Sequence, residues 1–565
     1  MIIAVDTETT GLNPYTGDKP FAISIHGDKE FLDYNVRTGE AHVKSYICIG
    51  EDDLVPLDLA LMSTNYVKVF HNAKFDIQML KVYGMEVKGE IHDTMIMAAV
   101  YNPDETSKAL KRLAEKYLGA DTSEEKELKE YMRKHKLKAY EEVPREIMEP
   151  YALKDVEYTM DLFEFYRSKG VLDNPVYKTE MKLLQVLVDM QQRGAQLDID
   201  YLTSAKQLCE MGLAELNARI KTEFGDVNVL SNKQLGKFLF DEERIQCNAY
   251  SQAGNPVLDD YNLKQYDHPI IPLVIEMRDV TKRLNTYVYG LLDGADDKGV
   301  IHCDFYQVGA KTGRFSCRQP NLQNIPRGGS VDIRKSFNCR PDYTNYYFDY
   351  SQIELRILAH YSKEQKMIDE LSRADGDLHG MTAELIFGED YTKEQRDIAK
   401  RLNFGIVYGI GPKHFCEVLN QAYPESNYTY TSAKSFIDRY YHNYYEVRKF
   451  TWNVPRRILE KGYVQDVFGR RYTCDKNMTY KAVNYLIQGC AAGVLKNAMI
   501  KVHSLLRDTK SNILLTIHDE IVIEIHKDEE VLVKQIKKMM EDYKTFRVPI
   551  TCNISKTTTN WSEKE

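Results

Sequence analysis

The stretch LLTIHDEIVIEI (residues 514–525) places His518, Asp519 and Glu520 inside a run of β-branched and apolar residues. The flanking sequences NILLTI and IVIEI are typical of β-strands, and the charged residues between them predict a tight turn joining two antiparallel strands. The turn is either a solvent-exposed hairpin tip or a metal ligand held on a rigid β-ribbon. The second interpretation requires a partner carboxylate elsewhere in the chain.

The size and composition of the chain limit its class. Its 565 residues predict several domains rather than one core. The net charge of −9 gives no global sign of nucleic-acid binding, but it does not exclude a local basic groove. The ten cysteines form no CxxC pair, which argues against zinc ribbons and disulfide scaffolds and favours a reducing, cytoplasmic setting. We expect no membrane span, and the strand-like MIIAVD leaves no room for a signal peptide.

Strand-like and helical segments are unevenly distributed along the chain. Residues 1–170 mix both kinds, as in IIAVDTETTG and SKALKRLAEKYLG, which predicts an α/β domain. Residues 171–292 follow long helical periodicity, and strands alternate with helices again from residue 301. The sequence therefore predicts a multidomain α/β protein.

A candidate partner for Asp519 lies in NYYFDYSQIELRILAHYS (residues 345–362), where an aromatic strand ends in Asp349 and an amphipathic helix follows. A buried, unpaired charge is costly, so an aspartate at the end of a buried strand calls for a ligand or a partner. Asp349 and Asp519 together suit two Mg²⁺ ions about 3.5–4 Å apart, the arrangement that supports in-line phosphoryl transfer. Spacing alone leaves this interpretation open.

A third segment, TKEQRDIAKRLNFGIVYGIGP (residues 392–412), begins with the capping box of Thr392 and Gln395. Four residues then follow at intervals of four, two cations before two aromatic rings: Arg396, Lys400, Phe404 and Tyr408. Cation-rich stripes are usually solvated, and the rings could belong to a core. The combination nevertheless suits a nucleoside triphosphate, with phosphates at one end and a stacked base at the other.

The segments DYSQIELRILAH, RDIAKRLNFGIVYG and IHDE resemble motifs A, B and C of family A DNA polymerases, the DNA polymerase I type, in the family's order. TGRFSCRQPNLQNIP, GDLHGMTAELIFG, GYVQDVFGRRY and NYLIQGCAAGVLKNAM are also similar to that family, and SNKQLGKFLF is similar to its thumb more loosely. The resemblance covers essentially the whole chain and implies a right-hand polymerase. Its expected parts are the thumb and connecting helices at 171–300, the palm at 301–360 and 446–565, and the fingers at 361–445.

The resemblance also implies roles for individual residues of the polymerase site. Asp349, Asp519 and the Tyr350 carbonyl would bind two Mg²⁺ ions, for which Mn²⁺ is a substitute, and Glu520 would be auxiliary. The residues expected to bind the nucleotide are Tyr350, Gln352, Glu354, His379, Arg396, Lys400, Phe404 and Tyr408. Lys400 would protonate the leaving pyrophosphate, and Glu354 resembles the steric gate against a ribose 2′-hydroxyl. Phe404 replaces the Tyr of some members, which implies discrimination against dideoxynucleotides.

The residues expected to contact DNA are Thr312, Arg314, Asn321, Gln323, Asn484, Gln488 and His518. Minor-groove acceptors occupy similar positions in every correct base pair, so such contacts test pair shape without reading sequence. Two positions depart from the family pattern. Tyr480, with Lys481 beside it, stands where the family often has Arg, and Lys311 replaces the more usual Thr or Gln.

The N-terminal segment carries carboxylates in three short patterns. VDTETTG supplies Asp6 and Glu8, which share one face of a strand. HNAKFD supplies Asp76, four residues after Asn72, and YALKD supplies Tyr151 and Asp155, one helical turn apart. Each pattern alone is weak, but in this order they resemble the Exo I, II and III motifs of DEDD-type 3′–5′ exonucleases. The resemblance implies an RNase H-like domain over residues 1–170, in which the four carboxylates bind two metals and Tyr151 orients the attacking water.

The predicted function is template-directed addition of dNTPs to a primer 3′ end by two-metal phosphoryl transfer, with 3′–5′ exonucleolytic proofreading. A pocket that selects by shape gains only about 1–3 kcal/mol per small difference, so a second hydrolytic site is the usual remedy. The expected partners are primer-template DNA and dNTPs, with any helicase, primase or single-strand-binding partner unassigned. No 5′-nuclease domain and no thioredoxin-binding insertion are expected, so the chain resembles compact phage replicases, which act in the host cytoplasm.

Three alternatives remain. A single-subunit RNA polymerase shares the palm motifs, but Glu354 and the nuclease motifs argue against it. An RNase D-like 3′–5′ exonuclease with a polymerase-like accessory region is opposed by the presence of Asp349, Asp519, Arg396 and Lys400. A DNA-binding scaffold with inactive sites is opposed by seven carboxylates in matching positions.

Overall fold

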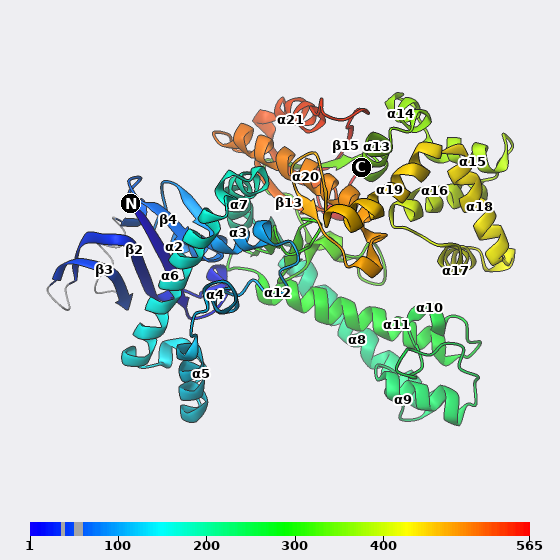
Figure 1. The fold of residues 1–565 in the computed structure, drawn as a ribbon. Coiled ribbons are helices and arrows are strands. Elements are labelled where there is room, and N and C mark those ends of the chain that lie inside the picture. The colour runs from blue at the N-terminus through cyan, green and yellow to red at the C-terminus, as the bar shows by residue number, and fades with distance from the viewer. Residues whose placement is uncertain (36–39, 50–59) are drawn as a thin grey trace.

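The computed structural model describes residues 1–35, 40–49 and 60–565. In Figure 1 the N-terminal α/β domain lies at one end, a helical arm projects away from it, and the C-terminal half forms a sheet with a separate helical lobe. Three large hydrophobic cores match these parts: one in the N-terminal domain, one at the tip of the arm and one beneath the C-terminal half. Among the described residues no helix has the length and apolar character needed to cross a membrane.

The N-terminal domain is built on a mixed sheet with the strand order β3-β2-β1-β4-β5. β1 runs antiparallel to β2 and parallel to β4. Its consecutive residues Ile3, Ala4 and Val5 are all buried, so both faces of the strand are covered. The strands are β1 (Ile2–Thr9), β2 (Pro20–Asn35), β3 (Glu40–Ile49), β4 (Val67–Phe70) and β5 (Ile91–Asp93). The helices are α2 (Ala73–Val82), α3 (Thr94–Tyr101), α4 (Leu110–Leu118), α5 (Ser123–His135) and α6 (Arg145–Ser168). α6 packs along β1 and β2.

Helix α7 (Pro175–Arg193) connects the N-terminal domain to the rest of the chain. Its residues Leu184 and Val188 are buried in the core of the N-terminal domain, whereas Leu183 and Leu187 are buried in the core of the C-terminal half. Each of these pairs is spaced four apart, so the two apolar stripes lie on different faces of one helix. The same helix therefore stabilises both parts.

The arm consists of two long antiparallel helical runs that extend side by side (Figure 1). Its helices are α8 (Ile199–Phe224), α9 (Asn232–Gly236), α10 (Asp260–Leu263), α11 (Ile270–Lys282) and α12 (Tyr289–Gly294), with π-helical turns at Lys237–Glu242 and Arg283–Val288. Leu235, Leu239, Leu263 and Val274 build a small core of its own at the tip. The arm therefore has the helical character that the sequence predicts for this region.

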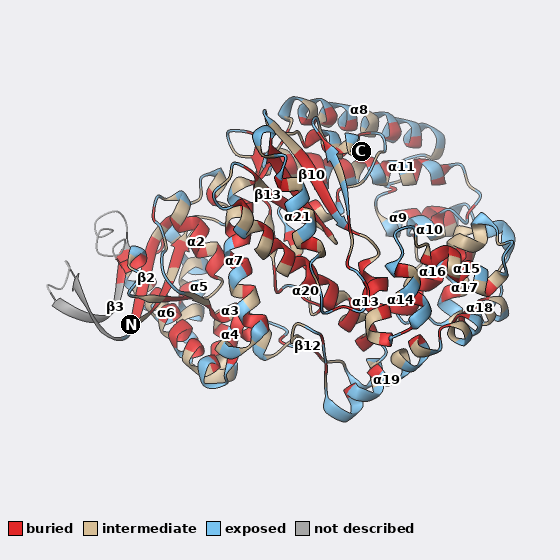
Figure 2. Cartoon of the chain, turned by 90° about the horizontal axis from the view of Figure 1, so that it is seen from above, coloured by how far each residue is buried: buried red, intermediate tan, exposed pale blue. Residues whose placement is uncertain are grey.

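The C-terminal sheet has the strand order β13-β14-β10-β15 and runs antiparallel throughout. Its strands are β10 (Tyr343–Tyr350), β13 (Asn512–Ile517), β14 (Glu520–His526) and β15 (Cys552–Thr557). The predicted hairpin is confirmed: β13 and β14 pair directly, and His518 turns the chain with a left-handed φ of 54°. Helices α13 (Ile353–Ser362), α20 (Lys481–Leu506) and α21 (Leu532–Glu541) belong to the same part, and α20 is largely buried (Figure 2).

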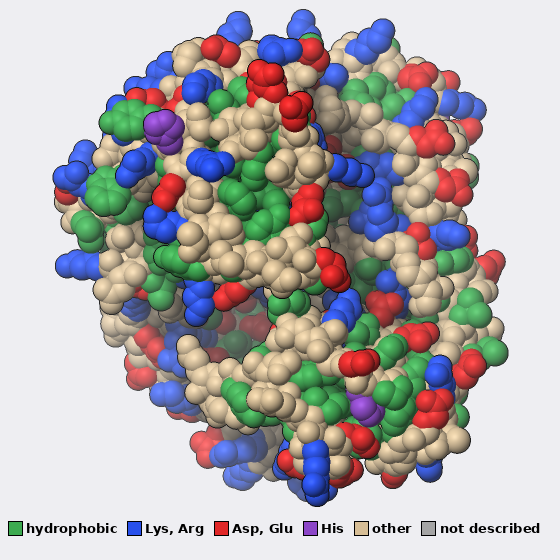
Figure 3. Space-filling view, turned by 90° about the vertical axis from the view of Figure 1, so that its right-hand side faces the viewer, with side chains coloured by type: hydrophobic (Ala, Val, Ile, Leu, Met, Phe, Trp, Pro, Cys, Tyr) green, Lys and Arg blue, Asp and Glu red, His purple; other side chains and the backbone are tan. Residues whose placement is uncertain are grey.

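The helical lobe projects from this sheet and contains α14 (Gln365–Ser372), α15 (Leu378–Phe387), α16 (Lys393–Val407), α17 (Pro412–Ala422) and α18 (Tyr430–Asn443). α19 (Tyr445–Lys461) leads back to the sheet. The capping box expected at the start of α16 is present, with Thr392 and Gln395 each bonded to the other's backbone. The face that carries the lobe and the arm is deeply hollowed, and Lys and Arg side chains lie around the hollow (Figure 3).

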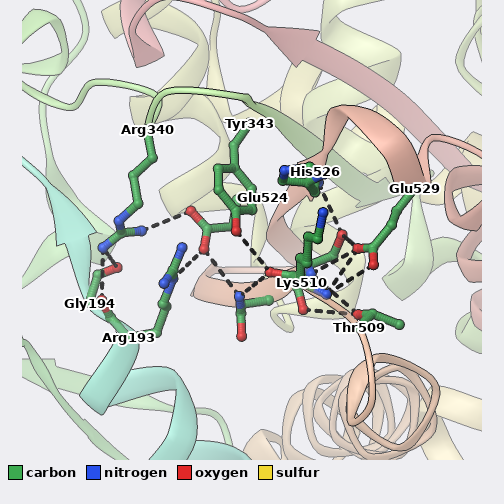
Figure 4. A network of polar contacts seen from close by, with 11 residues as sticks. Arg193, Gly194, Arg340, Tyr343, Thr509, Lys510, Glu524, His526 and Glu529 are labelled. Carbon is green, nitrogen blue, oxygen red and sulfur yellow. Dashed lines mark hydrogen bonds and ion pairs between the residues drawn. The ribbon is translucent and has the colours of Figure 1, made fainter.

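A buried carboxylate ties the end of α7 to the β-hairpin (Figure 4). Glu524 of β14 accepts from Arg340 at 2.8 Å and from Arg193, and its side chain is almost completely buried. Arg340 also donates to the backbone carbonyl of Gly194 at 3.1 Å. These bonds satisfy a charge that would otherwise be costly to bury. They fix the hairpin relative to α7.

Further polar contacts join the N-terminal domain and α7 to the C-terminal half. Lys74 of α2 pairs with Asp304, and Asp189 of α7 accepts from His503 of α20 at 2.9 Å. A second contact surface involves Asp104, in the loop after α3. Its carboxylate binds both the Lys311 ammonium and the Thr473 hydroxyl.

Candidate active sites

The fold brings Asp349 and Asp519 together. Asp349 is the penultimate residue of β10, and Asp519 lies in the turn between β13 and β14. The backbone N–H of Tyr350 donates to the Asp519 carbonyl at 3.2 Å, and Glu520 stands opposite Asp349 in the register of the two strands. Burial and then the Glu520 carboxylate raise the pKa of Asp349 to about 6. Such crowding of like charges favours a bound cation.

Glu520 is neutralised by a residue that the sequence did not single out. The Lys564 ammonium pairs with its carboxylate, and both side chains are largely buried. The auxiliary role expected for Glu520 stays a prediction. No local signal marks Lys564, which lies 44 residues further along the chain.

Residues from separate motifs meet beside Asp519. The Arg314 guanidinium lies 2.6 Å from Glu354 and 3.7 Å from Asp519. The Tyr408 hydroxyl donates to the other oxygen of Glu354 at 3.4 Å. Burial raises the pKa of Glu354, and Arg314 opposes this shift. The structure thus places Glu354 between a predicted DNA contact and a predicted nucleotide contact.

The cations of α16 lie on one face of the helix, as the sequence predicts. Arg396 makes a two-bond ion pair with Asp377, at 2.8 and 2.9 Å. Asp377 was not among the predicted site residues, although it directly precedes α15. Lys400 is exposed one turn further along α16. Tyr408 follows the last residue of the helix, and Phe404 packs partly buried against the core.

Burial and neighbouring groups favour the neutral form of the His379 ring. Its Nδ1 accepts from the Asn403 amide at 3.1 Å, and Asn403 also donates to Thr382 at 3.1 Å. Burial, followed by the charge of Arg396, lowers the pKa of His379 to about 4. With Nδ1 as acceptor, the neutral ring carries its proton on Nε2. His379 therefore offers a neutral N–H donor near Arg396.

The other predicted DNA and nucleotide contacts occupy varied environments. Asn484 and Gln488 lie one turn apart on α20, and His518 is exposed at the hairpin turn. Thr312 is buried, and the Asn321 side chain accepts from the Gln323 N–H at 3.0 Å. These roles stay predictions.

Two of the predicted contacts contain buried acceptor atoms without a hydrogen bond in the described part of the chain. They are Oδ1 of Asn484 and Oε1 of Gln352. Gln352 also has a left-handed backbone, with φ of 50°, just before α13. Buried polar atoms are almost always bonded, so these two oxygens are candidates for a ligand or an ordered water.

The second carboxylate site lies in the N-terminal domain. Asp6 and Glu8 project from β1 and Asp155 from α6, and their ligand oxygens lie within 4.8 Å of one another. Burial raises the pKa of Asp6 to about 7, and burial with the Asp6 charge raises that of Glu8 to about 8. Asp76 lies outside this group of three, and its Oδ1 accepts from the Thr7 hydroxyl at 2.6 Å.

Lys111 of α4 also belongs to this site, although sequence reasoning missed it. Its ammonium pairs with Asp155 and lies 3.0 Å from Glu124 of α5. It stands over the Tyr151 ring, 4.3 Å from the centroid. Burial lowers the pKa of Lys111, and the neighbouring Glu124 opposes this shift.

The donor sets of both sites fit hard divalent cations. Each consists of carboxylate oxygens, with a backbone carbonyl available at Tyr350, and no soft sulfur ligand stands among the predicted site residues. Ions such as Mg²⁺ prefer ligands of this kind. Burial is the largest cause of the raised pKa values in both sites, and neighbouring carboxylates add to it at Glu8 and Asp349.

The two carboxylate sites lie in segments of the chain that match known protein families. Residues 199–563 match the family model described as DNA polymerase family A, and residues 2–170 match that described as 3′-5′ exonuclease. The chain belongs to DNA polymerase family A and carries a 3′–5′ exonuclease domain. The predicted fold class, an RNase H-like exonuclease domain followed by a right-hand polymerase, is confirmed. Domains of both kinds generally use divalent metals.

Several bacterial proteins named DNA polymerase I are similar to this chain. That of Synechocystis sp. is 33% identical over 88% of this chain, and that of Chloroflexus aurantiacus is 32% identical over 99%. The chain spans 53% and 61% of their respective lengths. A solved structure, the POL domain of Pol1 from M. smegmatis in complex with DNA primer-template and dNTP, has the same fold. Its TM-score is 0.81 at 24% identity, over 100% of this chain and 96% of that one.

Proposed function

We propose that the protein is a template-directed DNA polymerase that extends a primer 3′ end with dNTPs and removes mismatched ends with its own 3′–5′ exonuclease. The observation that carries this proposal is the backbone bond from the Tyr350 N–H to the Asp519 carbonyl, which holds the end of β10, with Asp349, beside the turn that carries Asp519. The M. smegmatis structure was solved with primer-template and dNTP, which supports the same substrates here. For the bounds of the domains we propose those predicted from the sequence.

In the polymerase site, Asp349, Asp519 and the Tyr350 carbonyl would hold two divalent metals, for which we propose Mg²⁺. Bound there, such ions would activate the primer 3′-hydroxyl and neutralise the departing pyrophosphate. Arg396, Lys400 and His379 bind the triphosphate. Lys400, which is exposed on α16, donates the proton that the pyrophosphate takes up.

The same site selects the incoming sugar and base pair. Glu354 blocks a 2′-hydroxyl, and its bonds from Arg314 and Tyr408 keep it in place. Phe404 and Tyr408 complete the sugar and base pocket. Asn484, Gln488 and His518 contact the primer-template on its minor-groove side. These assignments follow the family motifs on which the residues stand.

In the nuclease site, Asp6, Glu8, Asp76 and Asp155 would hold the metals, and Tyr151 orients the attacking water. A mismatched primer end frays easily and reaches this site as a single strand. We propose replication as the biological task. The phage-type form expected from the sequence stays a prediction, since the relatives described above are bacterial.

A gel assay with a 5′-labelled primer on a longer template tests the proposal. With Mg²⁺ and all four dNTPs we expect extension to the template end, and without dNTPs we expect shortening. Replacing one dNTP by its ribonucleotide should stop extension at that base. Shortening without any extension would contradict the polymerase assignment and support the RNase D-like alternative.

A further inference from the structure

Helix α19 (Tyr445–Lys461) has an inner and an outer face of different character. Val447, Val454 and Ile458 are buried and share the side of the helix that packs against the C-terminal half. The residues on the opposite side recur at helical spacing and are all exposed. They form the α19 stripe: Tyr445, Arg448, Lys449, Trp452, Arg456 and Leu459.

The α19 stripe exposes large apolar side chains. Trp452 is 70% exposed, Leu459 57% and Tyr445 56%. The chain has two tryptophans, and the other, Trp561, is buried. Single exposed apolar residues are common on protein surfaces, whereas several gathered on one helix face mark a surface that binds a partner.

The charges of the α19 stripe all have the same sign. Lys449 pairs with Glu446 at 2.8 Å and stands over the Tyr445 ring, 4.3 Å from its centroid. The guanidinium groups of Arg448 and Arg456 have no ion pair in the described part of the chain. Over the whole helix, five cations and two carboxylates leave a net charge of +3, although the chain carries −9. This face therefore suits an anionic partner.

Rings and cations alternate along the stripe. Two cations stand between the Tyr445 and Trp452 rings, and Arg456 follows four residues after Trp452. Each step is about 5 Å along the helix axis. A partner helix would need apolar residues at every third or fourth position, where this stripe has cations. A nucleic-acid strand instead offers a base and a phosphate in turn, and proteins bind single strands through stacked rings and cations along the backbone.

The inner face of α19 fixes the stripe relative to the proposed polymerase site. Phe450 stacks on Tyr361 of α13, with ring centroids 6.1 Å apart. α13 begins at Ile353, four residues after Asp349. One short helix therefore separates the stripe from the carboxylates of the palm sheet.

We propose that the α19 stripe is a binding site for single-stranded DNA, separate from the two carboxylate sites. Bases stack on its two aromatic rings, and backbone phosphates pair with its free guanidinium groups. The inference rests on the proposed function, under which the unpaired part of the template strand is the ligand. The stripe holds that strand beside the fingers while the primer is extended.

Tryptophan fluorescence tests the proposal directly, because stacking on a base quenches an indole and only Trp452 is exposed. The full chain is first saturated with a blunt hairpin duplex, which occupies the proposed primer-template cleft. EDTA withholds metal from the nuclease. A dT strand of about 12 nucleotides, within the usual size of such sites, is then titrated in. We expect saturable quenching.

The double variant Arg448→Gln with Arg456→Gln keeps the indole and removes two phosphate partners. We expect the dissociation constant of the dT strand to rise about tenfold or more, and the slope of log affinity against log salt to become shallower by about 1.4. Lys534→Gln with Lys538→Gln is the matched control. These two cations of α21 are exposed and have no ion pair among the described residues, so their loss should leave binding unchanged.

Trp452→Ala tests the stacking contact with a fluorescein-labelled dT strand, whose anisotropy reports binding without the indole. We expect binding to weaken about fivefold or more. The far-ultraviolet circular dichroism of each variant should match that of the unmodified protein, because the side chains exchanged are exposed.

Two results would overturn the proposal. One is unquenched indole emission at saturating dT strand. The other is tighter binding of an acidic peptide of equal charge, which would assign the stripe to a protein partner. Primer extension across a one-nucleotide overhang separates this inference from the proposed function, since it needs no strand beyond the templating base. The arginine variant should extend such a primer normally, whereas absence of extension in every protein would refute the proposed function.

Discussion

The Arg314 guanidinium lies 2.6 Å from the Glu354 carboxylate, joining a residue predicted to touch the primer-template to the residue predicted to exclude ribonucleotides. Tyr408 bonds the other oxygen of Glu354. A carboxylate held from two sides has little freedom to move away from an incoming 2′-hydroxyl. The predicted sugar gate and the predicted primer-template contact are therefore connected through one ion pair.

Replacing Glu354 by alanine should relax sugar selection. Loss of the carboxylate opens the space that a 2′-hydroxyl needs, so we expect the ratio of kcat/KM for dCTP over CTP to fall by about 100-fold or more, which corresponds to about 3 kcal/mol. Single-nucleotide insertion kinetics measure this ratio. Tyr408→Phe, which removes only one bond to Glu354, should lower the ratio by less. An unchanged ratio in Glu354→Ala would refute the gate.

Phe404→Tyr should improve the use of dideoxynucleotides. A tyrosine hydroxyl at this position would supply a hydrogen bond that the missing 3′-hydroxyl of the substrate can no longer make. We expect the preference for dNTP over ddNTP to fall at least tenfold, which is about the value of one such bond. Chain-termination assays with mixed dNTP and ddNTP give the ratio. An unchanged preference for dNTP over ddNTP in Phe404→Tyr would contradict this role of Phe404.

Asp519→Asn should separate the two activities. The substitution keeps the shape of the hairpin turn but removes a charge from the polymerase site, so we expect primer extension to fall at least 1,000-fold. Shortening of a single-stranded primer should stay within a factor of two, because Asp6, Glu8 and Asp155 are unaffected. Asp528→Asn, an exposed change beyond the end of β14, serves as the control. Parallel loss of both activities would contradict two independent sites.

The two carboxylates proposed for the polymerase site could be singled out from the sequence because each interrupts an apolar pattern. Asp349 and Asp519 are charges within strand-like runs, and the stripe of α16 keeps a constant spacing. Lys564 and Lys111 were not predictable in this way. Each pairs with a carboxylate 44 residues away, and only the tertiary fold brings them together. Within α4, Lys111 differs from its neighbour Lys116 in burial, which sequence alone does not express.

The hydrogen-bond partners of Arg396 and His379 were not predictable from the sequence for a related reason. Asp377 and Asn403 belong to segments that the sequence did assign to the fingers, but their contacts depend on how α15 packs against α16. Helical spacing predicts which residues share a face of one helix. It does not predict which residue of a neighbouring helix lies opposite. The sequence therefore predicts the helices and their assignment to the fingers, but not the hydrogen bonds between helices.

The stability of the fingers should depend on pH through His379. Its pKa in the folded protein, about 4, lies below the ordinary value of 6.5. The unfolded state therefore binds the proton more readily, so this contribution to stability is complete above pH 6.5 and is lost as the pH falls towards 4. His379→Gln should reduce the loss of unfolding free energy between pH 7 and pH 4.5 by about 2 kcal/mol. His414→Gln, at an exposed site, should leave the loss unchanged.

Urea unfolding at several pH values measures this dependence for the three proteins. If the unfolding free energy falls equally steeply with pH in His379→Gln and in the unmodified protein, His379 does not resist protonation in the folded state.

Glu180→Gln should destabilise the junction between α7 and α20. The Glu180 carboxylate accepts from Lys496 at 2.7 Å and pairs with Arg470, and all three side chains are buried or nearly so. Removing the negative charge leaves two cations in a dry environment, at a cost of about 3–5 kcal/mol. Chemical unfolding measures the change, with Glu446→Gln at an exposed ion pair as control. A change below about 1 kcal/mol would contradict this account.

Two contacts of the nuclease domain bear on how a copying error would be corrected. Lys74 pairs with Asp304, and Asp104 binds Lys311 and Thr473. With α7 buried in both cores, these contacts hold the nuclease domain and the palm sheet in one arrangement. Under the proposed function, the primer end rather than the nuclease domain would travel between the two sites, so the ease with which that end unpairs from the template would decide when it is removed.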